Sequence, residues 1–211
     1  MTNFIPIFPL GLVVYPGESL NLHIFEPRYK QLISECVQAG KPFGIPSVIG
    51  QSVKEFGSLV EVVEVSNVYD NGEMDIKTRG LRVFRILEMI KDIPDKLYSG
   101  AIVNYPDNRE QGSIELMRKV VQQIRELHDL LKVEKDFKKE TDSLRSYDVA
   151  HHIGLSVEEE YELLVLMDER QRQEYLRQHL TRTVTTLQGM EQLKEKIKLN
   201  GHFKNLSGFD I

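Results

Sequence analysis

The sequence is poor in cysteine, and Cys36 is the single example among 211 residues. One cysteine excludes an internal disulfide and any zinc site that needs several thiolates. Free cysteines are among the most buried residue types, and Cys36 lies in a stretch with helical apolar spacing. We therefore expect it to be a buried, inert thiol.

Long apolar runs are also missing, and none approaches the roughly 20 residues that span a bilayer. The N-terminus has neither the basic nor the apolar segment of a signal peptide. Hydrophobic residues make up 41% of the chain and charged residues 28%, which is ordinary for a soluble globular protein. The sequence predicts a cytoplasmic protein with no membrane partner.

An excess of basic residues is absent, because 27 Lys and Arg stand against 32 Asp and Glu, for a net charge of −5. Nucleic-acid binders usually carry a basic excess or a basic stripe. The closest approach to a stripe is the series Lys77, Arg79, Arg82 and Arg85. Glu73, Asp75 and Glu88 interrupt it, and mixed charges are common on exposed strands. We expect a solvated sheet face and no nucleic-acid partner.

Motifs for nucleotide, acyl or metal chemistry are missing as well. The single Gly-Lys pair, Gly40-Lys41, is followed by Pro42 and lacks the upstream glycine of a phosphate-binding loop. The sequence contains neither G-x-S-x-G nor H-E-x-x-H. A Ser–Lys dyad stays open, because its partners can be distant in sequence. We assign no catalytic residue and no cofactor.

Adjacent histidines, His151 and His152, are the remaining candidates for a metal site. Neighbouring side chains on a helix point about 100° apart, so they do not easily share one metal ion. A role at a helix C-terminus is favoured, because an imidazolium there interacts well with the helix dipole. His23 and His128 are isolated and receive the same structural interpretation, so no metal site is predicted.

Strand signals at hairpin-like spacing occupy the first half of the chain. Leu20, Leu22 and Ile24 alternate with polar residues, as in a half-buried strand. Asn71-Gly72 is a strong signal for a two-residue hairpin turn. Further extended stretches cover residues 42–50, 59–69, 74–78, 81–90 and 99–105, with a loop at 51–57 and a helix from Pro27 to Gly40. This pattern favours an antiparallel, partly closed β structure.

The second half becomes helical after a polar linker at residues 107–112. Apolar residues recur every three or four positions between Ile114 and Leu131, as on one face of a helix. A charged linker at residues 132–139 and a helix at 142–153 are expected to follow.

Two further helices are predicted by their N-terminal signals. Ser156 with Glu159 forms a capping box, and Asp168 with Gln171 forms another. The last helix, over residues 169–199, would be about 45 Å long. A helix of that length overruns a small domain, so it either braces several elements or joins a second copy of the chain in a homo-oligomer.

A signature near the N-terminus combines turn residues with the start of the first helix. Its members are Pro9, Leu10, Pro16, Gly17, Leu22, Ile24, Phe25, Glu26, Pro27, Arg28 and Tyr29. It closely resembles the opening of the Lon N-terminal, or substrate-binding, domain. The helical half adds a second match at Gly154, Leu155, Ser156, Glu158, Glu159, Leu163, Leu164, Asp168, Arg172, Leu176 and Leu180. The resemblance covers nearly the whole chain.

Full-length Lon proteases continue into an ATPase module and a Ser–Lys protease module, whereas this sequence ends at Ile211. The resemblance therefore implies a stand-alone Lon domain without those modules. It also implies an α+β fold. We expect a PUA-like, mostly antiparallel β barrel with a helix at residues 1–106, and a C-terminal helical bundle with a long last helix at residues 107–211.

Structural roles are expected for most of the signature. These positions are Pro9, Pro16, Gly17, Phe25, Glu26, Pro27, Arg28 and Tyr29. Glu26 favours the positive end of a helix dipole, and we expect Arg28 to pair with a carboxylate on the sheet.

The function implied is non-catalytic recognition of unfolded protein or peptide segments, as an adaptor or regulator in protein quality control. A protease or chaperone is the expected partner. The candidate contact residues are Phe4, Phe8, Leu12, Val14, Tyr15 and Phe43, with ordinary core positions as the alternative. Two other functions stay open. PUA-like barrels sometimes bind RNA or nucleotides, and the family name also suggests an ATP-dependent peptidase.

Overall fold

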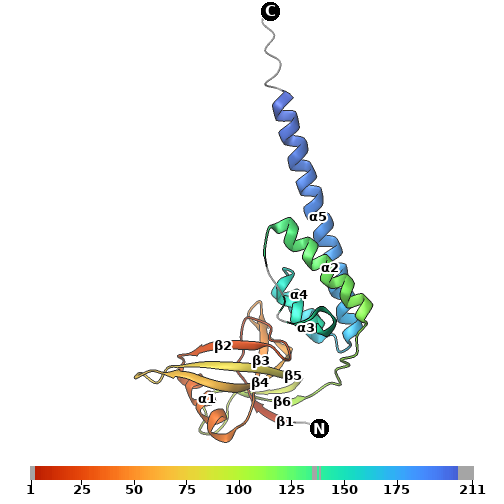
Figure 1. The fold of residues 1–211 in the computed structure, drawn as a ribbon. Helices are drawn as coiled ribbons and strands as arrows, with labels where there is room; N and C mark the ends of the chain where they lie inside the picture. Colours follow the sequence, from red (N-terminus) through yellow and green to blue (C-terminus); the bar gives the residue numbers. More distant parts are fainter. Residues whose placement is uncertain (1–2, 135–136, 138, 204–211) are drawn as a thin grey trace, which may run out of the picture.

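The computed structural model of the chain describes residues 3–134, 137 and 139–203 (Figure 1). Its first part is a β body that contains one helix. The elements are β1 (Asn3–Pro6), β2 (Ser19–Ile24), α1 (Pro27–Ala39), β3 (Phe43–Ile49), β4 (Ser52–Val68), β5 (Met74–Ile90) and β6 (Gly100–Asn104).

All paired strands run antiparallel, in the order β1-β6-β5-β4-β3, and β2 pairs with β5. The segment after β1 closes this sheet by pairing in parallel with β3 through bridges at Ile7 and Leu10. The Phe8 N–H donates to the Gly44 carbonyl at 2.7 Å. The α+β fold with a mostly antiparallel, closed β part is thereby confirmed.

β4 and β5 are longer than the sequence predicted. Each spans 17 residues, and together they form a ribbon that extends beyond the barrel. The loop predicted at residues 51–57 is wrong, because β4 begins at Ser52. The break predicted between 78 and 81 is also wrong. Gly80 stays within β5, where the Tyr15 carbonyl approaches so closely that a Cβ would collide with it.

α1 begins and ends where the sequence predicted. Pro27 is its first residue, and Gly40 ends it in the left-handed conformation with φ 61°. The helix buries Tyr29, Leu32, Ile33 and Cys36 in the barrel core. The expected burial of Cys36 is confirmed, and desolvation raises the pKa of its thiol to about 11.

The helical part stands at one end of the β body (Figure 1). It consists of α2 (Ile114–Leu131), α3 (Ser146–Val149), α4 (Val157–Val165) and α5 (Glu169–Phe203), with short 3₁₀ turns at Thr141–Ser143 and Ala150–His152. The predicted capping box of Ser156 and Glu159 is present at the start of α4. Asp168 caps α5 by accepting from the backbone N–H of Arg170 at 2.9 Å.

The single helix predicted at residues 142–153 is wrong. This segment is divided into α3 and the two 3₁₀ turns. Ser146 donates both its backbone N–H and its hydroxyl to Glu169, at 2.8 and 2.9 Å. The Glu169 carboxylate, which is distant in sequence, accepts the hydrogen bonds that Ser146 donates. Side-chain acceptors of this kind compete with the backbone carbonyls of a helix.

The two parts of the chain share one apolar cluster. Val13, Tyr15 and Val83 from the β part pack with the buried faces of α2, α4 and α5. The division into two domains at residues 1–106 and 107–211 remains a prediction, because buried side chains from both sides of that boundary pack in the same cluster.

α5 runs beside α2 and then continues past it (Figure 1). Gln123 donates to Thr181 at 2.8 Å and Gln188 donates to Glu126 at 2.7 Å, so the two helices run parallel. Among the helices of the described residues, none has the length and apolar character needed to cross a membrane.

Two glycine substitutions test this packing in opposite directions. Gly80→Ala should lower the free energy of unfolding by about 2 kcal/mol, because its Cβ would displace the Tyr15 backbone. Gly189→Ala, on the exposed face of α5 with no atom near its Cβ, should raise it by about 0.5–1 kcal/mol. Urea denaturation of both variants measures the difference. A neutral Gly80→Ala would contradict the close approach.

Candidate functional site

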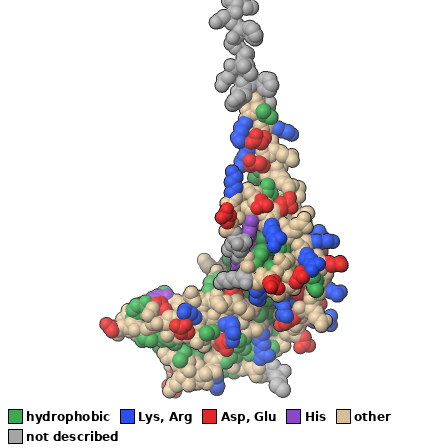
Figure 2. All heavy atoms as spheres, in the orientation of Figure 1, with side chains coloured by type: hydrophobic (Ala, Val, Ile, Leu, Met, Phe, Trp, Pro, Cys, Tyr) green, Lys and Arg blue, Asp and Glu red, His purple; other side chains and the backbone are tan. Residues whose placement is uncertain are grey.

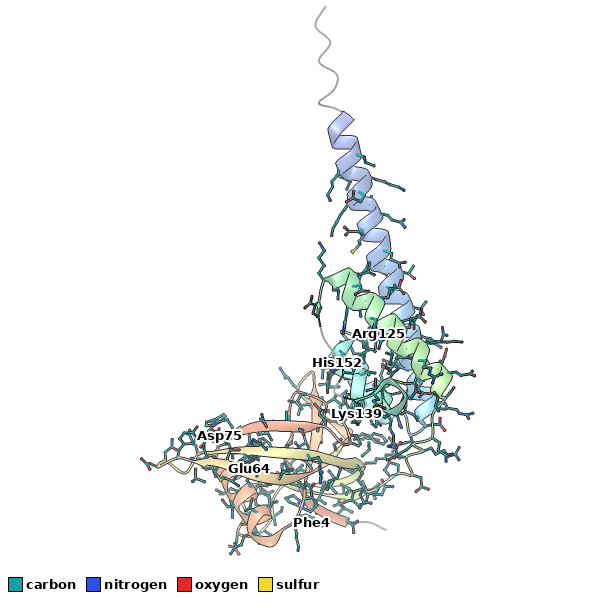
Figure 3. The ribbon with its side chains drawn as sticks, in the orientation of Figure 1. Phe4, Glu64, Asp75, Arg125, Lys139 and His152 are labelled. Atoms are coloured by element: carbon teal, nitrogen blue, oxygen red, sulfur yellow. The ribbon has the colours of Figure 1, made fainter. Side chains whose placement is uncertain are left out.

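A cleft lies where the turn before β2 meets the segment that carries α3. It consists of two adjoining cavities of about 490 and 510 Å³. Both are lined by Pro16, Gly17, Lys139, Tyr147 and Asp148. In Figure 3, Lys139 and His152 lie at this junction, whereas Asp75 lies toward the far tip of the ribbon.

The Tyr147 ring forms the floor of the cleft, because it lines both cavities, and Tyr15 packs behind it. Tyr15, which is fully buried, stacks on Tyr147 with ring centroids 4.9 Å apart. Its hydroxyl donates to the Glu160 carbonyl at 3.0 Å, so a side chain of the β part is anchored to α4. Burial raises the pKa of Tyr147 to about 12, and both phenols therefore stay neutral at physiological pH. The floor offers apolar contact area without charge.

A histidine bridges the two walls of the cleft. His151 Nδ1 lies 2.6 Å from Glu160 Oε1 on α4, and its Nε2 lies 3.2 Å from Glu18 Oε2 on the turn before β2. The hydrogen bond to Glu18, together with that to Glu160, raises the pKa of His151 to about 9. The imidazolium is therefore the species present at neutral pH, and both ring nitrogens donate. The predicted helix C-terminal role is replaced by a bridge between the two parts.

A buried ion pair fixes the helical wall. Arg172 donates through Nε to Glu169 at 2.8 Å, and both side chains are almost completely buried. The same guanidinium donates to Asn108 Oδ1 at 2.8 Å and to the Leu166 carbonyl at 2.6 Å. It also lies 4.4 Å from the centre of the Tyr147 ring. One side chain thus connects the linker, the end of α4, α5 and the cleft floor.

Charges around the cleft are neutralised in pairs. Lys139 pairs with Asp148 at 2.6 Å, and Arg145 pairs with Glu110. The basic series on the strands is partnered in the same way. Lys77 pairs with Glu64, Arg79 with Glu61 and Arg85 with Glu55, and the Arg82 guanidinium lies over the Tyr105 ring. Figure 2 shows acidic and basic side chains intermixed over the visible face.

The predicted contact residues do not form one surface. Phe8, Val14, Tyr15 and Phe43 are buried, so the core alternative holds for these four. Leu12 is half-buried at the rim of the barrel core. Phe4 is 52% exposed and lies on β1, away from the cleft (Figure 3).

The signature residues have mostly local roles. Tyr29 stacks on Phe8 with ring centroids 3.8 Å apart. The prediction that Arg28 pairs with a sheet carboxylate is wrong, because it pairs with Glu26 at 2.7 Å, two residues away. Three members face outward or line a cavity: Phe25 is exposed, and Pro16 and Gly17 line the cleft. Pro9 precedes the parallel bridge at Leu10, and Pro27 begins α1.

Sequence patterns did not identify Tyr147, Lys139 or Asp148 as cleft residues, since they lie in a segment whose position depends on distant contacts. His128 and His23 have structural contacts as well. His128 Nε2 lies 3.0 Å from the His152 carbonyl, and exposed His23 lies between Asp75 and Glu73. Within the described residues, no cluster of three or more His, Cys, Asp or Glu side chains is arranged to hold a metal ion.

Comparison with solved structures identifies the class of fold. The crystal structure of a Lon N-terminal domain protein from Xanthomonas campestris has a TM-score of 0.65 at 24% identity, covering 82% of this chain and 96% of that one. The N-terminal domain of a Mycobacterium avium complex Lon protease has a TM-score of 0.60 at 14% identity, covering 85% and 98%. At these identities the likeness establishes the fold.

Sequence comparison gives the family. The family model of the ATP-dependent protease La (LON) substrate-binding domain matches residues 5–182. The chain belongs to this family. The LON peptidase N-terminal domain and RING finger protein C14F5.10c of Schizosaccharomyces pombe (strain 972 / ATCC 24843) is 27% identical over 109 residues. That match covers 43% of this chain and 22% of the relative's length.

The bridge at His151 predicts a pH-dependent stability. Folding raises the pKa of His151. The contribution of its ion pairs to the free energy of unfolding is therefore complete below about pH 6.5 and is lost as the pH rises through about 9. Because the ring is partly exposed, we expect His151→Gln to cost about 1 kcal/mol at pH 6.

Urea denaturation of both proteins at pH 6 and pH 10 measures this contribution. The difference in unfolding free energy should disappear at pH 10. An equal difference at both pH values would show that the ring acts by packing alone.

Proposed function

We propose that this chain is a non-catalytic module that recognises unfolded or extended segments of other proteins. The observation that carries the proposal is the cleft between the β barrel and the helical part, with the Tyr147 ring on its floor and its charges neutralised in pairs. Its membership in the LON substrate-binding domain family supports the same function.

The chemistry of the cleft suits a polypeptide. Recognition sites for peptides combine apolar contact area with a few polar groups that fix orientation. Here Tyr147 and Leu81 supply apolar area, and the neighbouring ion pairs leave little net charge. A ligand that varies in sequence but always carries a peptide backbone matches such a surface.

The alternatives receive less support. The strand cations that would contact a nucleic-acid backbone already face carboxylates or a ring, so releasing them for phosphate would cost these contacts. For the peptidase alternative, we place no residue in a catalytic role and propose that the chain does not cleave its ligand.

In the cell we place this module in the cytoplasm, as an adaptor or regulator of protein quality control. The relative from Schizosaccharomyces pombe combines, by its name, a LON peptidase N-terminal domain with a RING finger. A protease or chaperone is the partner that we propose for this chain.

We further propose that a second copy of the chain pairs along the end of α5. Met190, Leu193 and Ile197 are exposed on one face of this helix, at three- and four-residue spacing. The same stretch carries both charge signs, with Lys194 bonded to Glu191 and Lys198 to Glu195. An identical helix can therefore cover the apolar side chains and supply opposite charges.

A binding experiment tests recognition. The parent protein should bind reduced, carboxymethylated α-lactalbumin, which cannot fold, without ATP. Leu81→Asp should weaken this binding about tenfold, because Leu81 is 38% exposed and lines the cleft. Leu87→Asp is the matched control on the same strand, 49% exposed and outside the cavities that form the cleft, and should bind as the parent does.

Fluorescence anisotropy measures the affinities, and labelled casein with and without ATP serves as the cleavage reporter. We expect no cleavage. Equal weakening by Leu81→Asp and Leu87→Asp would show that the cleft is not the binding site. Absence of any binding by the parent would contradict the proposed function itself.

Sedimentation velocity tests the helix pairing. The double variant Leu193→Glu, Ile197→Glu should sediment as a monomer under conditions where the parent is a dimer, because it places carboxylates in the apolar contact. Gln192→Glu, an exposed change on a different face of α5, should leave the dimer intact. A monomeric parent at high concentration would refute the pairing.

A further inference from the structure

β2 is an edge strand of the ribbon. Among the strands that the structure describes it pairs with β5 alone, and it is the outermost strand on the side that faces the helices (Figure 1). The Gly80 N–H donates to the Glu18 carbonyl, and the Thr78 hydroxyl donates to the Leu20 carbonyl. Residues 18, 20, 22 and 24 therefore point their backbone groups at β5, because hydrogen-bonded pairs alternate along antiparallel strands.

The intervening residues point their backbone groups away from β5. Ser19, Asn21 and His23 each present an N–H and a C=O to the open edge. Among the described residues, no loop or side chain forms a hydrogen bond with these groups. An unpaired row of this kind is a template for another strand.

Other borders of the sheet are protected, and β2 is not. β3 contains Pro46 and a bulge, and the segment after β1 covers it. The outer half of β4 contains bulges and carries Glu61 and Glu64. β2 has no proline, no bulge and no Lys, Arg, Asp or Glu. Proteins usually blunt open edges with such features, so their absence here indicates an edge kept available.

The side chains along β2 define the chemistry of an added strand. Leu20 and Leu22 are half-buried at the rim of the barrel core, while Asn21 and His23 are exposed on the opposite face. A strand beside β2 would place alternate side chains against these two faces. Apolar residues would extend the core on one face, and polar residues would lie beside Asn21 and His23.

The open edge also leads into the cleft. Ser19, the first residue of β2, lines the second cavity together with Glu18 and Tyr147. A chain that follows β2 toward Ser19 therefore reaches residues that line the cleft. The edge and the cleft form one continuous surface for an extended polypeptide.

We propose that β2 binds an extended segment of unfolded polypeptide by strand addition, with a preference for alternating apolar and polar residues. This inference rests on the proposed function, because it names the ligand class and the binding mode for the same surface. Main-chain hydrogen bonds supply affinity, and the rim at Leu20 and Leu22 supplies the alternation.

Asn21→Pro tests the proposal on the protein. Proline removes the outward N–H of Asn21 and places its ring in the path of an added strand, but it leaves the bonds to β5 in place. It should weaken binding of carboxymethylated α-lactalbumin about tenfold, the effect of losing one or two backbone hydrogen bonds. Asn21→Thr keeps the N–H and should bind within about twofold of the parent.

A peptide pair tests the same bonds without changing the protein. An eight-residue peptide of alternating valine and threonine should bind. Its analogue with every valine and threonine N-methylated should bind at least tenfold more weakly, because it offers no N–H to β2 in either strand orientation. This arm decides the question if Asn21→Pro does not fold, which circular dichroism will show.

The outcomes separate this inference from the proposed function. If the unfolded protein binds in a Leu81-dependent way but the N-methylated peptide binds as well as its parent, strand addition is wrong and recognition stands. If neither unfolded probe binds the parent protein, both fail. Weakening by Asn21→Pro and by N-methylation together supports strand addition.

Discussion

The arrangement of the helical part depends on the buried guanidinium of Arg172. It bonds to Glu169 within α5, to Asn108 in the linker and to the carbonyl at the end of α4. Glu169 in turn holds Ser146 at the start of α3. Burying two charges is costly, and such a pair adds little net stability over apolar residues of the same size. The consequence of the Arg172–Glu169 pair is geometric, because it holds the segment that carries α3 and lines the cleft in one position.

The cleft takes its second wall from the β part by apolar contact. Tyr15 is fully buried, stacks on Tyr147 and bonds to the backbone of α4, and His151 adds a charged bridge from the same region to Glu18. The Tyr15 and His151 rings lie 4.9 Å apart, so a packed ring and an ion pair hold the two walls together at one place in the junction. A surface prepared in this way loses less conformational entropy when it binds a flexible chain.

Local signals predicted the elements well, and distant contacts account for the errors. Pro27 and Gly40 marked α1, and Ser156 with Glu159 marked the start of α4, because each acts through neighbours in sequence. A loop was predicted at residues 51–57 and a break between 78 and 81, yet Gly57 and Gly80 lie inside strands where other backbone segments approach closely. The helix predicted at 142–153 failed because Glu169 captures Ser146. Tyr15 was predicted as a contact residue and Tyr147 was not identified, since only the fold brings the two rings together.

The apolar cluster that joins Val13, Tyr15 and Val83 to the helices has a practical meaning for anyone dissecting this polypeptide. A fragment cut after the last strand would expose those three side chains to water and tend to self-associate. The structural unit with a complete apolar core is therefore larger than the barrel. The match to the family model, residues 5–182, stops two positions before Val184, the last side chain of α5 that is buried in the shared cluster among those the structure describes. A fragment that ends after Val184 would keep every buried side chain described in this cluster, whereas one that ends at residue 182 would lose the last of them.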